Sequence, residues 1–129
     1  MIKQNVFDTV VNHARTQCKR AMNGPTCAYR SSDGSKCFVG VLIPDDKYNP
    51  LLEGGEVMGS FTYSTENMSL SSAGRKVFQL LTELLSPHDK DWDLLKDLQV
   101  THDMYTIDQW ESQFRRIAKQ YELVYTPQE

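Results

Sequence analysis

Apolar residues recur every three or four positions in four segments of the chain, the spacing that gathers them on one face of a helix. Breakers follow two of these segments, Gly24-Pro25 after the first and Pro87 after the second. The predicted helices run from about Val6 to Met22, Ser72 to Leu85, Lys90 to Thr101, and Thr106 to Tyr121. The candidate N-caps are Asn5, Ser71 or Ser72, Asp89 or Asp91, and Thr106, with Gln109 completing a capping box.

A β-hairpin is predicted around Asp33-Gly34, because this dipeptide favours the tight turn in which both central residues have positive φ. The two predicted strands are Cys27–Ser31 and Lys36–Ile43. We favour the register that places Arg30 opposite Cys37. A three-residue loop would instead pair Arg30 with Lys36, and like charges directly opposite each other are unfavourable.

The second predicted strand is almost entirely apolar, so helices or another chain must cover both of its faces. Gly40, in its middle, indicates a bulge or the close approach of another backbone. The edge of this strand could also pair with that of a second copy. A homodimer is therefore one alternative for the assembly of this protein.

Residues 53–70 form the longest stretch without clear periodicity, although a short strand at 60–64 fits the pattern. Loops of this length within compact domains are often functional. The apolar segment at 123–125 could dock as an additional strand. The predicted fold class is therefore α+β: an antiparallel β-hairpin or small three-stranded sheet packed against about four α-helices, in a single domain of residues 1–129.

Length and composition agree with one soluble globular domain, since the 129 residues include 40% hydrophobic and 24% charged residues. The chain contains no apolar run of about 18 residues, so no membrane span is expected. Polar residues interrupt the N-terminal segment every few positions, which is unlike a secretory signal. We therefore expect a cytoplasmic protein without membrane association.

The formal net charge of −3 conceals an uneven distribution along the chain. Residues 1–36 carry six basic and two acidic side chains, a net +4, whereas residues 37–129 carry eight basic and fifteen acidic side chains, a net −7. A folded domain can mix the two sets on one surface. Alternatively, the asymmetry could create a dipolar surface that steers a charged partner.

Three cysteines, Cys18, Cys27 and Cys37, are an odd number that fits free thiols in a reducing compartment. With His13 they could complete a zinc site, but the spacing lacks the C-x2-C motif of structural zinc sites. The favoured hairpin register also places Cys27 and Cys37 on opposite faces of the ribbon. We interpret the cysteines as buried structural thiols, and we predict no metal and no cofactor.

Phosphate-binding loops, nucleophile elbows and the common metal-binding motifs are missing from the sequence. Two weak candidates for catalysis remain. Cys37 could be activated by a cross-strand Arg30. The adjacent carboxylates Asp45 and Asp46 could bind a divalent ion or cap a helical turn. We expect no catalytic residue, and an enzyme that uses Cys37 or Asp45/Asp46 is the second alternative.

Acidic and basic clusters give two further candidate sites. Carboxylates recur beside His88, at Asp89, Asp91 and Asp93, and His102-Asp103 follows later; helix capping with a solvated acidic face is the favoured interpretation. His102 is expected at the edge of the apolar stripe rather than as a ligand. The basic candidates are Arg15, Lys19, Arg20, Arg30 and Lys36, which could bind phosphate. Nucleic acid is an unlikely partner, because the isoelectric point is about 5.6.

One pattern resembles small proteins of bacteriophages and bacteria that carry no assigned activity. It reads Cys27-x-Tyr29-Arg30-x3-Gly34-x-Lys36-Cys37-x2-Gly40-x-Leu42-Ile43-Pro44-Asp45-x2-Tyr48, with Leu94-Leu95-x2-Leu98-Gln99-x2-His102-Asp103 further on. The resemblance spans about residues 5–123. It implies one compact cytoplasmic domain, a phage accessory protein made in its host, and it assigns no catalytic residue.

The leading functional hypothesis is a non-enzymatic protein that acts through a protein partner, a host protein if the chain is phage-encoded, and inhibits or modulates a host system. The first alternative is a protein that binds a nucleotide or another small anionic ligand. The candidate binding residues are Arg15, Lys19, Arg30, Lys36, Asp45, Asp46 and Tyr48. Packing and turn geometry explain Arg30, Lys36, Asp45 and Tyr48 least well, so we expect a site where the second strand ends and the 44–50 turn begins.

Overall fold

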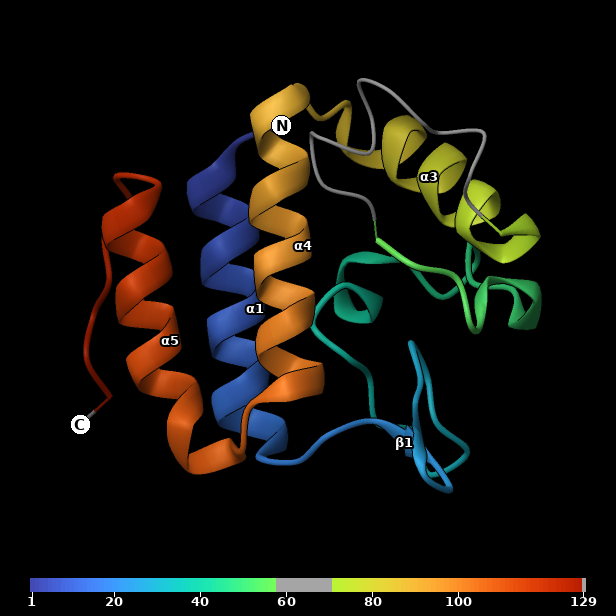
Figure 1. Ribbon diagram of the computed structural model, residues 1–129, viewed down its shortest axis with the longest axis horizontal. Coiled ribbons are helices and arrows are strands. Elements are labelled where there is room, and N and C mark those ends of the chain that lie inside the picture. The colour runs from blue at the N-terminus through green and yellow to red at the C-terminus, as the bar shows by residue number, and fades with distance from the viewer. Residues whose placement is uncertain (58–70, 129) are drawn as a thin grey trace.

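The computed structural model describes residues 1–57 and 71–128. Within them, α1 (Lys3–Gln17), α4 (Asp89–Met104) and α5 (Ile107–Gln120) lie side by side, and α3 (Ser72–Leu85) lies beyond α4 (Figure 1). A short antiparallel ribbon of β1 (Met22–Asn23) and β2 (Thr26–Cys27) follows α1. This arrangement confirms the predicted α+β class with a hairpin and about four helices. Of the described helices, none combines the length and apolar composition needed to cross a membrane.

Local capping explains why the later helices begin where they do. The Ser71 hydroxyl accepts a hydrogen bond from the Gly74 backbone N–H (2.9 Å) and begins α3, and α3 has the predicted bounds. Thr106 and Gln109 form the predicted capping box of α5. The N-cap of α4 is His88 rather than an aspartate, because the Asp91 carboxylate accepts the His88 backbone N–H (2.9 Å) from the third helical position.

The first helix is shorter at its C-terminal end than predicted. It ends at Cys18, whose φ of 54° is left-handed and whose backbone N–H bonds the Ala14 carbonyl (2.9 Å). Asn5 therefore lies inside the helix, and Ile2 is the N-cap. Gly24 and Pro25 do not end the helix but form the turn between β1 and β2, in which Met22 pairs with Cys27.

The predicted register at Asp33-Gly34 is wrong. The structure forms a single bridge there, between Arg30 and Lys36, which is the pairing that the repulsion of like charges disfavours. Repulsion is relieved because Asp45 Oδ1 lies 2.8 Å from the Arg30 guanidinium and 3.5 Å from the Lys36 ammonium. The three-residue loop is held by Asp33, whose carboxylate accepts the backbone N–H of Ser35 (3.0 Å).

The apolar segment after this turn is not a strand. Gly40–Leu42 forms a 3₁₀ turn (η1) that packs on α1. The close approach predicted at Gly40 is confirmed, because a Cβ atom there would lie 2.2 Å from the Tyr29 carbonyl oxygen. The strand edge proposed for homodimer pairing therefore does not exist in this segment. The apolar side chains Phe38, Val39 and Ile43 are buried nonetheless.

Phe38 lies at the centre of an aromatic cluster that joins this segment to α4 and α5. Its ring centroid is 4.8 Å from that of Trp110, 5.5 Å from that of Phe114 and 5.2 Å from that of His102. Phe7 of α1 meets Phe114 edge to face at 6.3 Å. The core therefore includes a non-helical segment between the helices.

The C-terminal tail docks without forming the additional strand that was predicted. The Gln4 side chain holds both backbone polar groups of Val124, with hydrogen bonds of 3.0 and 2.8 Å. The Tyr125 hydroxyl donates to Glu111 (2.7 Å). In the aperiodic 53–70 segment, Val57 is buried, whereas the strand predicted at 60–64 lies outside the described residues.

Candidate functional site

Four of the five predicted basic residues pair with carboxylates in the folded chain, whereas Arg20 donates to the Tyr105 carbonyl. Arg15 on α1 makes two hydrogen bonds to Glu111 on α5 (3.0 and 2.7 Å), and the nearby guanidinium holds the pKa of the Glu111 carboxyl below its usual range. Lys19 pairs with Asp33 at 2.8 Å. These cations therefore do not form an uncompensated surface for phosphate.

Four of the predicted binding residues do lie together, around Asp45. Arg30 and Lys36 both contact Asp45, and the Arg30 guanidinium lies over the Tyr48 ring, 4.8 Å from its centroid. The positive charge of Lys36, followed by the Arg30 hydrogen bond, lowers the pKa of Asp45. Asp46 is exposed and makes no ion pair with any residue in 1–57 or 71–128.

This Asp45 cluster is tied to the chain on its inner side. Arg30 also donates to the Ile43 carbonyl (2.8 Å). The Tyr48 hydroxyl donates to Glu53 (2.6 Å), and burial, together with this bond, raises the pKa of Tyr48 to about 12. Glu53 in turn accepts the backbone N–H groups of Tyr29 and Arg30. The cluster connects the 29–36 loop to the 43–53 segment, and an anion could reach Arg30 only by displacing Asp45.

Cys37 lacks the environment of a nucleophile. Its side chain is fully buried, and desolvation raises the pKa of the thiol to about 12. The activation expected from Arg30 fails because Arg30 lies opposite Lys36 and points to Asp45. The Gly40 backbone N–H donates to the Cys37 sulfur (3.2 Å), which fixes the turn at η1. Cys37 is thus a buried structural thiol, as the sequence indicated.

Thiol alkylation of the native protein tests these environments. Near neutral pH we expect iodoacetamide to label exposed Cys18 first and partly buried Cys27 more slowly, and to leave buried Cys37 unlabelled until the protein is unfolded in urea. A time course followed by peptide mass spectrometry measures the three rates. Labelling of Cys37 as fast as that of Cys18 in the native protein would contradict the buried, protonated thiol.

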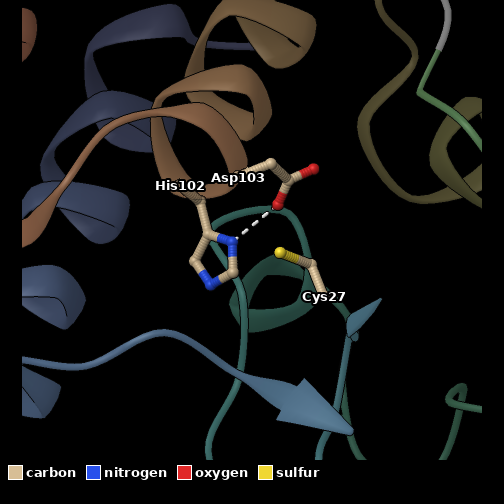
Figure 2. Close-up of side chains that lie close together, drawn as sticks. All are labelled: Cys27, His102 and Asp103. Carbon is tan, nitrogen blue, oxygen red and sulfur yellow. Dashed lines mark hydrogen bonds and ion pairs between the residues drawn. The ribbon is translucent and has the colours of Figure 1, made fainter. Parts of the chain in front are cut away.

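The expectation that all three cysteines are buried is wrong for two of them, since Cys18 is exposed and Cys27 is partly exposed. Cys18, Cys27, Cys37 and His13 do not gather into a ligand set. Among the described residues, the group of His, Cys, Asp or Glu ligand atoms that lie within 4.8 Å of one another is Cys27, His102 and Asp103 (Figure 2). The other acidic candidate, at the start of α4, serves as helix capping.

His102 is not at the edge of the core, as predicted, but fully buried within it. Its Nδ1 atom lies 2.7 Å from Asp103 Oδ1, and its Nε2 atom accepts the buried backbone N–H of Ala21 (3.0 Å). Because Nε2 accepts a hydrogen bond, the neutral ring carries its proton on Nδ1. This N–H donates a hydrogen bond to Asp103. Gln99 donates to the same Asp103 oxygen (3.0 Å).

This hydrogen bonding argues against both metal binding and base catalysis at the cluster. A metal on Nδ1 would require the imidazole proton to move to Nε2, where it would face the N–H of Ala21. The lone pair on Nε2 is directed at Ala21 and cannot take a proton from Cys27. Burial, followed by the negative charge of Asp103, raises the pKa of the Cys27 thiol. The cluster therefore provides a neutral thiol beside a fixed carboxylate.

A cavity of about 380 Å³ opens beside this cluster, between β2, the 53–57 segment and α4. Its polar side chains come mainly from α4 and the 53–57 segment, and apolar side chains lie among them. The residues that line it are Thr26, Cys27, Ala28, Tyr29, Glu53, Gly54, Gly55, Glu56, Val57, Lys96, Gln99, Val100 and Asp103.

Sequence reasoning missed this site for a specific reason. The sequence shows the pair His102-Asp103 near the end of a predicted helix. It does not show that Cys27 lies beside this pair, because the predicted hairpin places Cys27 in a different strand pairing. Comparison of the chain with protein-family models, curated proteins and solved structures finds no match.

Proposed function

We propose that this protein acts without catalysis, by binding another protein through the corner where α4 meets α5. The observation that carries the proposal is the exposure of two large apolar side chains at this corner. Met104, which ends α4, is 74% exposed, and Ile107, which begins α5, is 45% exposed. Exposed apolar side chains that cluster on a surface are typical of protein-protein contacts.

The surface at Ile107 is hollowed and offers both apolar and charged groups. A shallow depression of about 670 Å³ is lined by Met22 of β1 together with Arg20, Thr106, Ile107 and Asp108. Methionine side chains adapt their shape to a partner, and charged groups at a rim select it. We refer to Met22, Met104, Ile107 and this depression as the α4–α5 corner.

Two features of the remaining candidate sites favour this function over catalysis. The predicted cations Arg15, Lys19, Arg30 and Lys36 are compensated by carboxylates, and the Cys27 and Cys37 thiols have raised pKa values. If the chain is a phage protein, as the sequence resemblance implies, the partner is a host protein whose activity it modulates. A partner with an apolar projection would fit the depression.

A capture experiment with two charged variants tests the proposal. We expect Met104→Glu/Ile107→Glu to lose a specific partner that the wild-type protein retains from a bacterial lysate, because two carboxylates at the contact would remain unpaired when desolvated. Quantitative mass spectrometry of the captured proteins, followed by binding measurements with the purified partner, gives the readout.

The control is Leu51→Glu, which places one carboxylate on another highly exposed apolar position, 63% exposed in η2 (Pro50–Leu52). This variant should retain the partner with unchanged affinity. Circular dichroism confirms that each variant is folded. The proposal fails if no protein is retained specifically, or if the double variant and Leu51→Glu retain the partner equally well.

A further inference from the structure

We infer that the cavity beside Cys27 and Asp103 is a binding site for a small organic cation with an apolar body. Its volume, about 380 Å³, falls in the range of small-molecule sites. Its lining combines apolar walls with a small set of convergent polar groups, as such sites do. The cavity shares no lining residue with the α4–α5 corner, so this inference is independent of the proposed function.

The charged lining of the cavity determines the sign of the ligand. Three carboxylates, Glu53, Glu56 and Asp103, line it, against one basic side chain, Lys96, which is exposed. This excess of negative charge lowers the energy of a bound cation and raises that of a bound anion in a partly enclosed site. The anionic ligand considered from the sequence is therefore disfavoured at this cavity.

Asp103 is the carboxylate best placed to bind the charged group. Glu53 already accepts three hydrogen bonds, from Tyr48 and two backbone N–H groups, and Glu56 accepts two from Ser71. In Asp103, His102 and Gln99 both bind Oδ1, and the Cys27 thiol also interacts with this carboxylate. A carboxylate has about four acceptor positions, so the second oxygen, Oδ2, can still accept a hydrogen bond from a ligand. Figure 2 shows this second oxygen turned away from the imidazole.

The neighbours of Asp103 hold it in place for a ligand. His102 is fully buried and bonded on both ring nitrogens, so it fixes the carboxylate without competing for the ligand. The Asp103 side chain is 34% exposed and can be reached from the cavity. Cys27 is neutral beside it, which leaves the carboxylate charge for the ligand.

The cavity walls fit the apolar part of the ligand. Ala28 and Val57 are buried, and Val100 is 37% exposed at the cavity mouth. Covering these groups with an apolar ligand removes their surface from water. A primary amine with one small ring or a short hydrocarbon chain meets both requirements: its ammonium group donates to Asp103 Oδ2, and its body contacts the valines.

Three probes of matched shape and different charge test the inference. We expect benzylamine to raise the melting temperature in a saturable manner, benzyl alcohol to bind at least tenfold more weakly, and benzoate to produce no shift. Two-dimensional NMR should place the benzylamine-dependent shifts at Cys27, Gln99 and Val100. Failure of benzylamine to bind, or equal binding of benzoate, would overturn the inference.

Two variants locate the site. Asp103→Asn keeps an oxygen that can accept from His102 but removes the charge, and it should weaken benzylamine binding at least tenfold. Val100→Trp fills the mouth of the cavity from a partly exposed position, and it should abolish binding of both benzylamine and benzyl alcohol. The control Asp46→Asn removes an exposed carboxylate that makes no ion pair among the described residues and does not line the cavity, and it should bind like the wild type. Wild-type affinity in both Asp103→Asn and Val100→Trp would refute the assignment.

Discussion

Replacing Gly40 with alanine is expected to destabilise the protein by about 3 kcal/mol or more, near the upper end of the cost of overpacking a core. The new Cβ atom would lie 2.2 Å from the Tyr29 carbonyl oxygen and 3.2 Å from the Cys37 sulfur. The first contact is with backbone, which cannot rotate away as a side chain can. Relief requires the Tyr29 carbonyl to move, and that carbonyl also accepts the Cys37 backbone N–H (3.1 Å).

Urea unfolding followed by tryptophan fluorescence measures this loss. The control is Gly34→Ala, at a left-handed glycine (φ 89°) with open space around the Cβ position, where we expect a loss of only about 1 kcal/mol. Alkylation of Cys37 gives a second readout, because displacement of η1 should expose its thiol. A Gly40→Ala protein as stable as Gly34→Ala would show that the two backbone segments are not in close contact.

Phe38→Ala is the second large effect that we expect, a loss of about 4 kcal/mol. Phe38 is fully buried, and its ring packs against Trp110, Phe114 and His102, so truncation leaves a cavity at the junction of α4, α5 and the 37–43 segment. Since small domains are stable by only about 5–15 kcal/mol, this change would remove a large part of the total stability.

Chemical denaturation of a graded series tests this expectation. Phe38→Leu retains most of the volume and should lose less than half as much stability as Phe38→Ala. Leu51→Ala, at a position 63% exposed, should change stability by no more than about 0.5 kcal/mol. Equal losses in Phe38→Ala and Leu51→Ala would contradict the central position of Phe38.

Helix boundaries were predictable where the determining contacts are local. Ser71 caps α3 through a residue three positions away, and Thr106 and Gln109 cap α5 over the same distance. The end of α1 was not predictable in this way. Cys18 adopts a left-handed conformation although no glycine or proline is present there, so Gly24-Pro25 was mistaken for the end of the helix.

The prediction of the hairpin register failed because the register depends on a residue outside the hairpin. Within residues 27–43 the pairing of Arg30 with Lys36 is repulsive, and local reasoning rejects it. Asp45, beyond the apolar segment, folds back between the two cations and reverses that balance. The same long-range folding decides the 37–43 segment, which is buried as predicted but as a 3₁₀ turn against Tyr29 rather than as a strand.

One candidate site was predictable from the sequence, and the other was not. The sequence identified Arg30, Lys36, Asp45 and Tyr48 as polar residues that belong together, and the structure does gather them, yet into a compensated cluster. The cavity beside Asp103 could not be predicted, because Cys27 and His102-Asp103 come from opposite halves of the chain. Nothing in either segment alone specifies that they meet.

The sequence by itself determined the helical content, the caps of α3 and α5, the apolar residues of the core and the number of charges of each sign. Only the tertiary structure decided what those charges do. The basic N-terminal third and the acidic remainder do not separate into two surfaces, because α1 packs in the same layer as α5 and brings Arg15 to Glu111, while Asp45 returns to Arg30 and Lys36. Charges interact through distance in space, and position along the chain does not fix that distance.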